Sequence, residues 1–420
     1  MFYYFYDDKI SFTVYRFPFL YYFGMKESLK INQGIPSKVL LTLAIVAGVS
    51  VANLYYNQPL LNMIRIDLHI TEFQANFISM ITQTGYAAGL FFIVPLGDLF
   101  RKKNIVLINF SLLILSLITI GFSQSIWVLF IASFVTGACS IVPQIFVPIA
   151  AQYSIPKNRG RNVGIIISGL LTGILASRVF GGIVGEYLGW RAVFFIAAAF
   201  MVISTIVIMI VLPEINPTFK GNYKGLMKSI ISLINSYPRL LVYSSRAALA
   251  FGSFLGMWST LAFKMHLAPF HASSDIIGLL GLCGIVGALS ASFIGKYVKQ
   301  VGVRNFNVIG CFLMFTAWCI FVFGENSYAG IISGIILLDI GMQCIQLSNQ
   351  SSIFDVSPEA SSRINTIFMT TYFIGGSLGT LLAGIAWKID QWHGVAFSGM
   401  FLIICSLLVT IVEKAVSKHR

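Results

Sequence analysis

Two charged residues interrupt long apolar stretches of this sequence. Asp339 lies in the run Ile335-Ile-Leu-Leu-Asp-Ile-Gly, and Arg178 lies in a glycine-rich run that contains Gly173 and Gly182. In the hydrocarbon of a bilayer an isolated charge is costly, so each must be paired, hydrated or, for the acid, protonated. A carboxyl group that gains and loses a proton there can couple transport to protons. The alternative is an ion pair that only holds helices together.

Arg178 is the expected partner of Asp339. Arg178 lies about 17 residues, or about 25 Å, from the start of its helix, and Asp339 lies about 15 Å from the start of its own. The two residues should therefore lie within about 10 Å of each other in membrane depth. A guanidinium among close-packed glycines is costly unless it binds an acid or an anionic substrate. Arg246, about seven residues into another apolar run, is expected to reach toward the near surface with its long side chain and to be structural.

The elements that position these residues are membrane-spanning helices. The 420 residues are 57% hydrophobic and only 10% charged, whereas soluble domains carry about 25% charged residues. Lipid must therefore be the solvent, and the apolar runs of about 20 residues predict an all-α bundle rather than a β-barrel. The net charge of +13 does not indicate nucleic-acid binding, because the basic residues form short clusters between apolar runs, as in membrane proteins.

Twelve spans are predicted from the apolar runs. They cover residues 38–61, 73–98, 104–122, 126–153, 162–187, 191–213, 239–263, 275–297, 305–323, 329–354, 363–386 and 394–414.

An even number of spans places both termini on one side, and most Lys and Arg residues fall in the loops of that side. This bias predicts a multi-pass protein of the inner membrane with both ends in the cytoplasm. Two six-helix bundles, 38–213 and 239–414, are joined by a cytoplasmic linker at 214–238 with a short amphipathic stretch, and a tail covers 415–420.

The N-terminal 37 residues are predicted to be a cytoplasmic extension, in two parts. Residues 1–24 are dense in aromatic residues but broken by charges, and Met25 opens a more ordinary start. Residues 1–24 are interpreted as an upstream extension of the true start. The alternative is an aromatic segment that lies on the membrane surface.

The two halves repeat at an offset of about 201–202 residues, a kind of internal symmetry that transporters carry. Gly173 and Gly182 align with Gly375 and Gly384, and the turn that begins at Pro156 aligns with the turn that begins at Pro358.

Two motifs carry a family resemblance over residues 36–416. The loop after helix 2 is similar to the G-x-x-x-D-R-x-G-R-K signature of the major facilitator superfamily, keeping Asp98, Lys102 and Lys103 but departing at Val94, Leu99 and Arg101. Helix 5 is similar to the antiporter signature G-x8-G-x3-G-P-x2-G-G at Gly164, Gly173, Gly181 and Gly182, with Ser177 and Arg178 in place of Gly-Pro. With Tyr55-Tyr-Asn-Gln-Pro59 in helix 1, the chain resembles the efflux branch around the twelve-helix drug:proton antiporters.

The resemblance implies roles for two further sets of residues. It implies a gate in which Asp98, with Lys102 and Lys103, works against the start of helix 11 near Arg363. It also implies that helices 1, 4, 7 and 10 face the substrate path. The polar and aromatic residues on those helices are then candidates for the cavity: Asn53, Tyr56, Asn57, Gln58, Gln144, Trp258, Gln343, Gln346 and Asn349.

These observations predict a secondary transporter that exports a small neutral or weakly charged organic solute in exchange for protons, works as a monomer and needs no cofactor or metal. Proton-coupled import is the alternative within this class. A membrane enzyme is disfavoured because the five histidines are scattered and no HExxH, GxSxG or Walker A motif occurs. A channel is disfavoured because no filter-like loop or ring of charges is evident.

Overall fold

The computed structural model describes residues 29–215, 217, 221–354 and 361–418, and every regular element among them is a helix. Residues 1–24, interpreted above as an upstream extension, lie outside the described residues. Ten of the described helices are long and apolar enough to cross a membrane. The shorter apolar helix α1 adds one span, and α16 holds two helices that meet at Asp390 and Gln391. The predicted twelve-helix architecture is confirmed.

The first half comprises six spans. They are α1 (Ser37–Ala52) with η2 (Gln58–Leu60) and α2 (Leu61–Asp67), α3 (Glu72–Phe92) with α4 (Leu96–Leu99), α5 (Lys102–Phe122), α6 (Ile126–Cys139) with α7 (Pro143–Tyr153), η3 (Pro156–Asn158) with α8 (Arg159–Leu188), and α9 (Trp190–Val211).

The second half follows the connecting helix α10 (Tyr223–Ser236). Its elements are α11 (Pro238–His266), α12 (Ser274–Leu280) with η4 (Gly281–Cys283) and α13 (Gly284–Val301), α14 (Val303–Phe323), α15 (Tyr328–Phe354) and α16 (Ser361–Lys418).

Several of the predicted spans are divided into shorter helical segments at prolines. Pro59, Pro95 and Pro143 each stand at the start of a new helical segment, in η2, before α4 and in α7. Proline has no backbone N–H and clashes with the preceding turn, so a helix bends or restarts there. The polar side chains before Pro59 therefore lie in a turn, not on one face of a straight helix.

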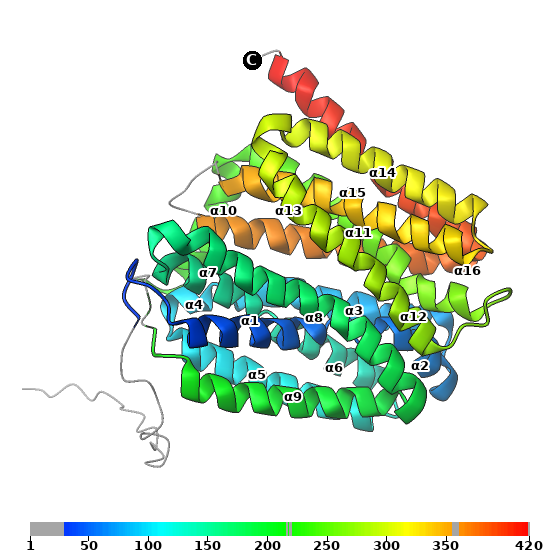
Figure 1. The fold of residues 1–420 in the computed structure, drawn as a ribbon, viewed down its shortest axis with the longest axis horizontal. Coiled ribbons are helices and arrows are strands. Elements are labelled where there is room, and N and C mark those ends of the chain that lie inside the picture. The colour runs from blue at the N-terminus through cyan, green and yellow to red at the C-terminus, as the bar shows by residue number, and fades with distance from the viewer. Residues whose placement is uncertain (1–28, 216, 218–220, 355–360, 419–420) are drawn as a thin grey trace, which may run out of the picture.

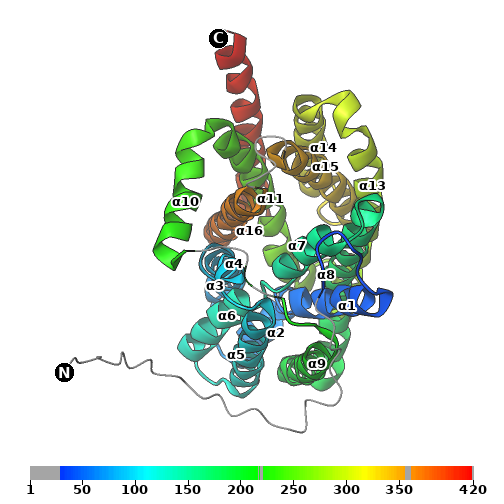
Figure 2. The same cartoon turned by 90° about the vertical axis from the view of Figure 1, so that its left-hand side faces the viewer.

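The two bundles lie side by side, with α5 and α9 in one and α14 and α15 in the other (Figure 1). We call the end of the molecule that holds α10 and the start of α1 the α10 face, and the other end the opposite face. The helix α10 packs Leu226 and Ile230 inward and lies beside α11 and α16 (Figure 2). Its Ser229 hydroxyl accepts a hydrogen bond from Arg363 at 3.1 Å.

The internal repeat appears as the same glycine-mediated helix crossing in each half. A Cβ at Gly173 of α8 would lie 2.2 Å from the Gly48 carbonyl oxygen of α1, and a Cβ at Gly379 of α16 would lie 2.2 Å from the Gly252 Cα of α11. Such close backbone approach is possible only without side chains. Helices α1 and α8 thus cross in the first half as α11 and α16 do in the second.

Not every glycine of the predicted helix-packing motif makes such a contact. Gly181 and Gly182 do: added Cβ atoms would lie 3.0 Å from the Tyr56 carbonyl oxygen and 2.4 Å from the Ser274 carbonyl oxygen. Gly164 does not, because a Cβ there would meet nothing within 4 Å. It lies near the start of α8 at the α10 face, away from the close crossing at Gly173. The helix-packing role predicted for Gly164 is therefore wrong for this conformation.

Candidate functional site

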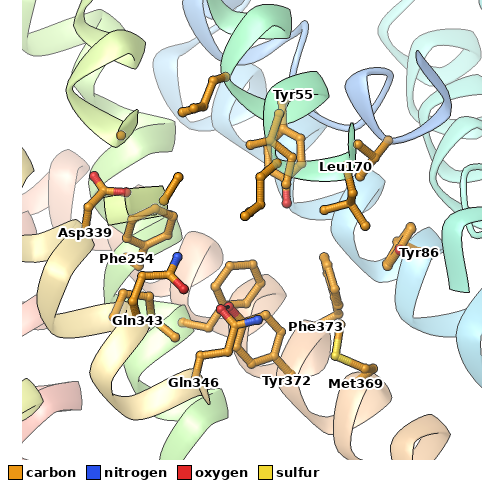
Figure 3. A pocket seen from close by; sticks show the side chains of 18 of the residues that line it. Tyr55, Tyr86, Leu170, Phe254, Asp339, Gln343, Gln346, Met369, Tyr372 and Phe373 are labelled. Atoms are coloured by element: carbon orange, nitrogen blue, oxygen red, sulfur yellow. Dashed lines mark hydrogen bonds between the residues drawn. The ribbon is translucent and has the colours of Figure 1, made fainter. Parts of the chain in front are cut away.

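A cavity lies between the two bundles near the middle of the molecule (Figure 3). Asp339, Gln343 and Gln346 reach it from α15, and Tyr55 reaches it from the turn after α1. Arg178 of α8 also lines it. Arg178 and Asp339 are the charged side chains among its described lining residues. Their surroundings therefore decide what chemistry the cavity offers.

The Asp339 side chain packs against two glycines of α13. It is 6% exposed. A Cβ at Gly287 of α13 would lie 2.8 Å from the Asp339 Cβ, and one at Gly284 would lie 3.6 Å from the carboxyl Oδ1. The other carboxyl oxygen, Oδ2, is buried and has no hydrogen-bond partner among the described residues. A buried carboxylate without a partner is costly, so this group needs a proton, a cation or water.

Arg178 is enclosed by aromatic rings and one amide. It is 3% exposed, and its Nε donates a hydrogen bond of 2.8 Å to Gln58 Oε1. Its guanidinium carbon lies 3.9 Å from the centre of the Trp258 ring and 5.4 Å from that of Tyr55. Aromatic faces stabilise a cation without neutralising it. These contacts thus stabilise the positive charge of Arg178 without neutralising it.

Arg178 and Asp339 are close enough to interact electrostatically, yet they form no ion pair with an N···O distance within 4.0 Å. Two of the other buried cations differ from Arg178 in this respect. Arg246 pairs with Glu413, and Lys264 lies 2.9 Å from Glu325. The expectation that Arg246 reaches the near surface is wrong, because its side chain is 0% exposed and bound to that carboxylate.

Only some of the predicted cavity residues line the cavity. Gln144, Gln343 and Gln346 do. Gln346 Oε1 accepts a hydrogen bond from the Tyr372 hydroxyl at 3.0 Å, and Gln144 Nε2 donates to the Tyr86 hydroxyl at 3.4 Å. These amides belong to the cavity wall and are tied to its aromatic residues.

The other predicted cavity residues hold helices together in this conformation. The Asn53 amide donates to carbonyls of its own helix, Asn57 donates to Thr82, and Asn349 donates to Asn307 at 2.9 Å. Tyr56 packs its ring against Phe180. In this conformation the turn before Pro59, and burial against neighbouring helices, keep these residues out of the cavity lining, and their contact with the solute stays a prediction.

Gln58 and Trp258 also lie outside the cavity lining, but both contact Arg178. They were predicted to touch the solute. Instead they position the residue that lines the cavity, because they surround its guanidinium.

Aromatic residues that the sequence did not single out form much of the wall. The Phe251 ring stacks on Tyr372 with centroids 3.8 Å apart, and the Tyr86 ring lies 4.3 Å from Phe373. Phe254 completes this aromatic wall. In an apolar sequence with 36 Phe and 17 Tyr residues, composition alone does not separate these rings from those that face lipid.

The two bundles are joined on the side of the cavity toward the opposite face. Among described residues, the direct hydrogen bonds between their helices lie from mid-depth to that face. The pairs are Asn76 with Ser259 at 3.0 Å, Thr84 with Ser377 at 2.5 Å, Trp387 with Glu72 at 2.7 Å, the Ser274 N–H with Glu186 at 2.9 Å, and Ser377 with the Met80 carbonyl at 3.0 Å. We call these contacts the seal.

The residues of the predicted gate lie at the α10 face. The Asp98 carboxylate is within electrostatic range of Lys102 and Arg363, so it faces the start of α16. Lys103 instead donates a 2.7 Å hydrogen bond to the Met209 carbonyl at the end of α9. The structure thus brings Asp98, Lys102 and Arg363 together and directs Lys103 elsewhere.

Comparison with known proteins agrees with this architecture. The family model described as Major Facilitator Superfamily matches residues 43–380. The chain is 34% identical over 380 residues to the uncharacterized transporter YgaY of Escherichia coli O157:H7, covering 90% of this chain and 96% of that protein.

Two solved structures share the fold. A bacterial homologue of the human lysosomal transporter Spinster, in an inward-facing and unoccupied conformation, superposes with a TM-score of 0.68 at 16% identity and covers 90% of this chain and 94% of its own. The nucleoside transporter NupG has a TM-score of 0.68 at 15% identity, covering 90% and 99%. The chain therefore belongs to the Major Facilitator Superfamily and is a multi-pass membrane transporter of that family.

Proposed function

We propose that the protein is a secondary active transporter that exports a small organic solute in exchange for protons, with Asp339 as the group that carries the proton. The observation that supports this most directly is the unpaired Asp339 carboxyl beside Arg178 in a cavity between the bundles. A buried acid that can exchange a proton for another partner is what proton coupling needs.

The proposed direction depends on which face is cytoplasmic. Most Lys and Arg residues of the loops lie at the α10 face, so by the positive-inside bias this is the cytoplasmic side of the inner membrane. The seal then lies on the outer side. In this conformation a solute reaches the cavity from the cytoplasm, and the partial antiporter signature around Gly173 and Gly181 supports export.

In the proposed cycle the solute and a proton occupy the same site in turn. With the seal closed, Asp339 releases its proton toward the cytoplasm and the solute binds. When the bundles rock and the seal opens, the solute leaves to the outside and Asp339 takes up a proton. Asp98 and Arg363 would approach as the α10 face closes. One chain contains both bundles, so a monomer suffices.

The test uses purified protein in liposomes that contain a pH-sensitive dye. Solutes of several classes are added on one side, with and without an imposed pH gradient. A carrier with the proposed coupling gives saturable solute movement with proton movement in the opposite direction. Co-directional movement would indicate import, and unsaturable flux without coupling would indicate a channel; either result contradicts the proposal.

A further inference from the structure

The cavity offers one positive and one negative group, and neither is neutralised by a protein partner. Arg178 makes its described hydrogen bond through Nε alone, to Gln58. Its terminal amino groups have no hydrogen bond to a described residue, and neither has Oδ2 of Asp339. Both side chains are more than nine-tenths buried. Arg246 and Lys264, buried to a similar degree, each have a carboxylate partner.

The charge pattern restricts the solute. A cation would meet the like charge of Arg178, an anion would meet that of Asp339, and a neutral molecule would give neither group a directly bound counter-charge, which is costly in a buried site. A zwitterion satisfies both at once. The two protein groups interact electrostatically, but no N···O distance between them is within 4.0 Å, so a ligand can place its own two charges between them.

The other residues that line the cavity indicate the chemistry of the uncharged part of that zwitterion. Phe254 lies beside Asp339, the amides of Gln343 and Gln346 come next, and Tyr372, Phe373 and Tyr86 line the part of the cavity farther from Asp339 (Figure 3). Aromatic walls favour a ring or a branched apolar chain, and a well-placed aromatic pair adds about 0.5–1.5 kcal/mol beyond the buried area. A small hydrophilic zwitterion would leave this wall unfilled.

We propose that the solute is an amino carboxylate with a large apolar side chain, such as an aromatic or branched amino acid. Its carboxylate binds the terminal amino groups of Arg178 and its ammonium group binds Asp339. This inference rests on the proposed function and explains its direction of coupling. The ammonium group and a proton compete for the same carboxylate, so solute and proton occupy the site in turn, which is exchange rather than co-transport.

The test compares solutes that differ only in charge. Binding to the purified full-length protein is measured for phenylalanine, tyrosine, leucine and methionine, and for 2-phenylethylamine and 3-phenylpropionate, which each keep one charge of phenylalanine. We expect at least one of the four amino acids to bind. If phenylalanine binds, each of its single-charge analogues should bind at least about tenfold more weakly than phenylalanine. For leucine the matched analogues are 3-methylbutylamine and 4-methylpentanoate.

Two variants make the assignment of charges testable. Arg178→Gln is expected to weaken binding of the amino acid about tenfold or more and to leave binding of the amine unchanged. Asp339→Asn is expected to weaken binding of the amino acid and to leave binding of the carboxylic acid unchanged. A structural defect would weaken all ligands alike. The matched controls are Arg101→Gln and Glu214→Gln, which break an exposed ion pair and are expected to change nothing.

Three outcomes would overturn the inference. The first is that none of the four amino acids binds, and the second is that a single-charge analogue binds as tightly as its parent. The third is that both variants weaken every ligand equally. If a solute of another class moves protons through Asp339, the zwitterion is wrong and the proposed function stands. If no solute moves protons, the proposed function fails as well.

Discussion

The Arg178 guanidinium lies 3.9 Å from the centre of the Trp258 ring, and this contact joins the two bundles. Arg178 belongs to α8 of the first bundle and Trp258 to α11 of the second. Trp258 is next to Ser259, which hydrogen-bonds Asn76 in the seal. Arg178 therefore lines the cavity and also contacts the second bundle next to the seal. Solute binding in the cavity and opening of the seal both affect this side chain.

Removing the Trp258 ring should loosen the seal. A desolvated cation–π contact contributes about 2 kcal/mol, which corresponds to a shift in the open-to-sealed ratio of about thirtyfold. We expect Trp258→Leu to speed maleimide labelling of a cysteine at Asn76, which is 2% exposed. Trp258→Phe, which keeps an aromatic face, should have a smaller effect. The measurement is the labelling rate in a background without the native cysteines, and equal rates in all three proteins would contradict the role.

Locking the seal should stop transport. The hydroxyl oxygens of Thr84 and Ser377 lie 2.5 Å apart across the bundles, so cysteines at both positions are close enough to be cross-linked. Because the carrier must open this contact once per cycle, we expect solute flux to fall about tenfold or more on cross-linking and to return on reduction. Each single cysteine serves as the control. Undiminished flux through the fully cross-linked protein would refute alternating access across this seal.

The glycine crossings predict which helix substitutions destabilise the protein. A Cβ at Gly173 or at Gly379 would meet backbone atoms 2.2 Å away, so alanine at either position should cost about 1–3 kcal/mol through overpacking. Gly164→Ala is the matched control. Its Cβ meets nothing within 4 Å, and alanine favours the helix by up to about 1 kcal/mol. Thermal unfolding in detergent checks the order: Gly173→Ala and Gly379→Ala below wild type, Gly164→Ala at or above it.

The fold could be predicted from the sequence because bilayer thickness sets the length of each apolar run. The repeat could be predicted as well, since the Gly173 crossing needs small residues at fixed spacing in both halves. Pro59 and Pro143 mark bends in the sequence, but whether a proline bends a membrane helix or restarts it depends on its neighbours, which the sequence alone does not give.

The site was only partly predictable. Asp339 and Arg178 stand out because a charge in an apolar run is costly wherever the helix faces. The amides of Asn53 and Asn57 do not indicate their own direction, since an amide hydrogen-bonds equally well across helices or into a cavity. Phe254 and Tyr372 carry no signal in the sequence, because a ring that lines a cavity has the same composition as one that faces lipid.

If Asp339 carries the coupled proton, Asp339→Asn should separate solute movement from proton movement. Asparagine keeps the size of the side chain but cannot lose a proton. Two fluxes of one transported solute are compared in liposomes: exchange across equal concentrations, and net transport driven by a pH gradient. We expect gradient-driven transport to fall about tenfold or more while exchange persists, though with weaker solute binding. If Asp339→Asn leaves gradient-driven transport at the wild-type rate, Asp339 is not the group that couples transport to protons.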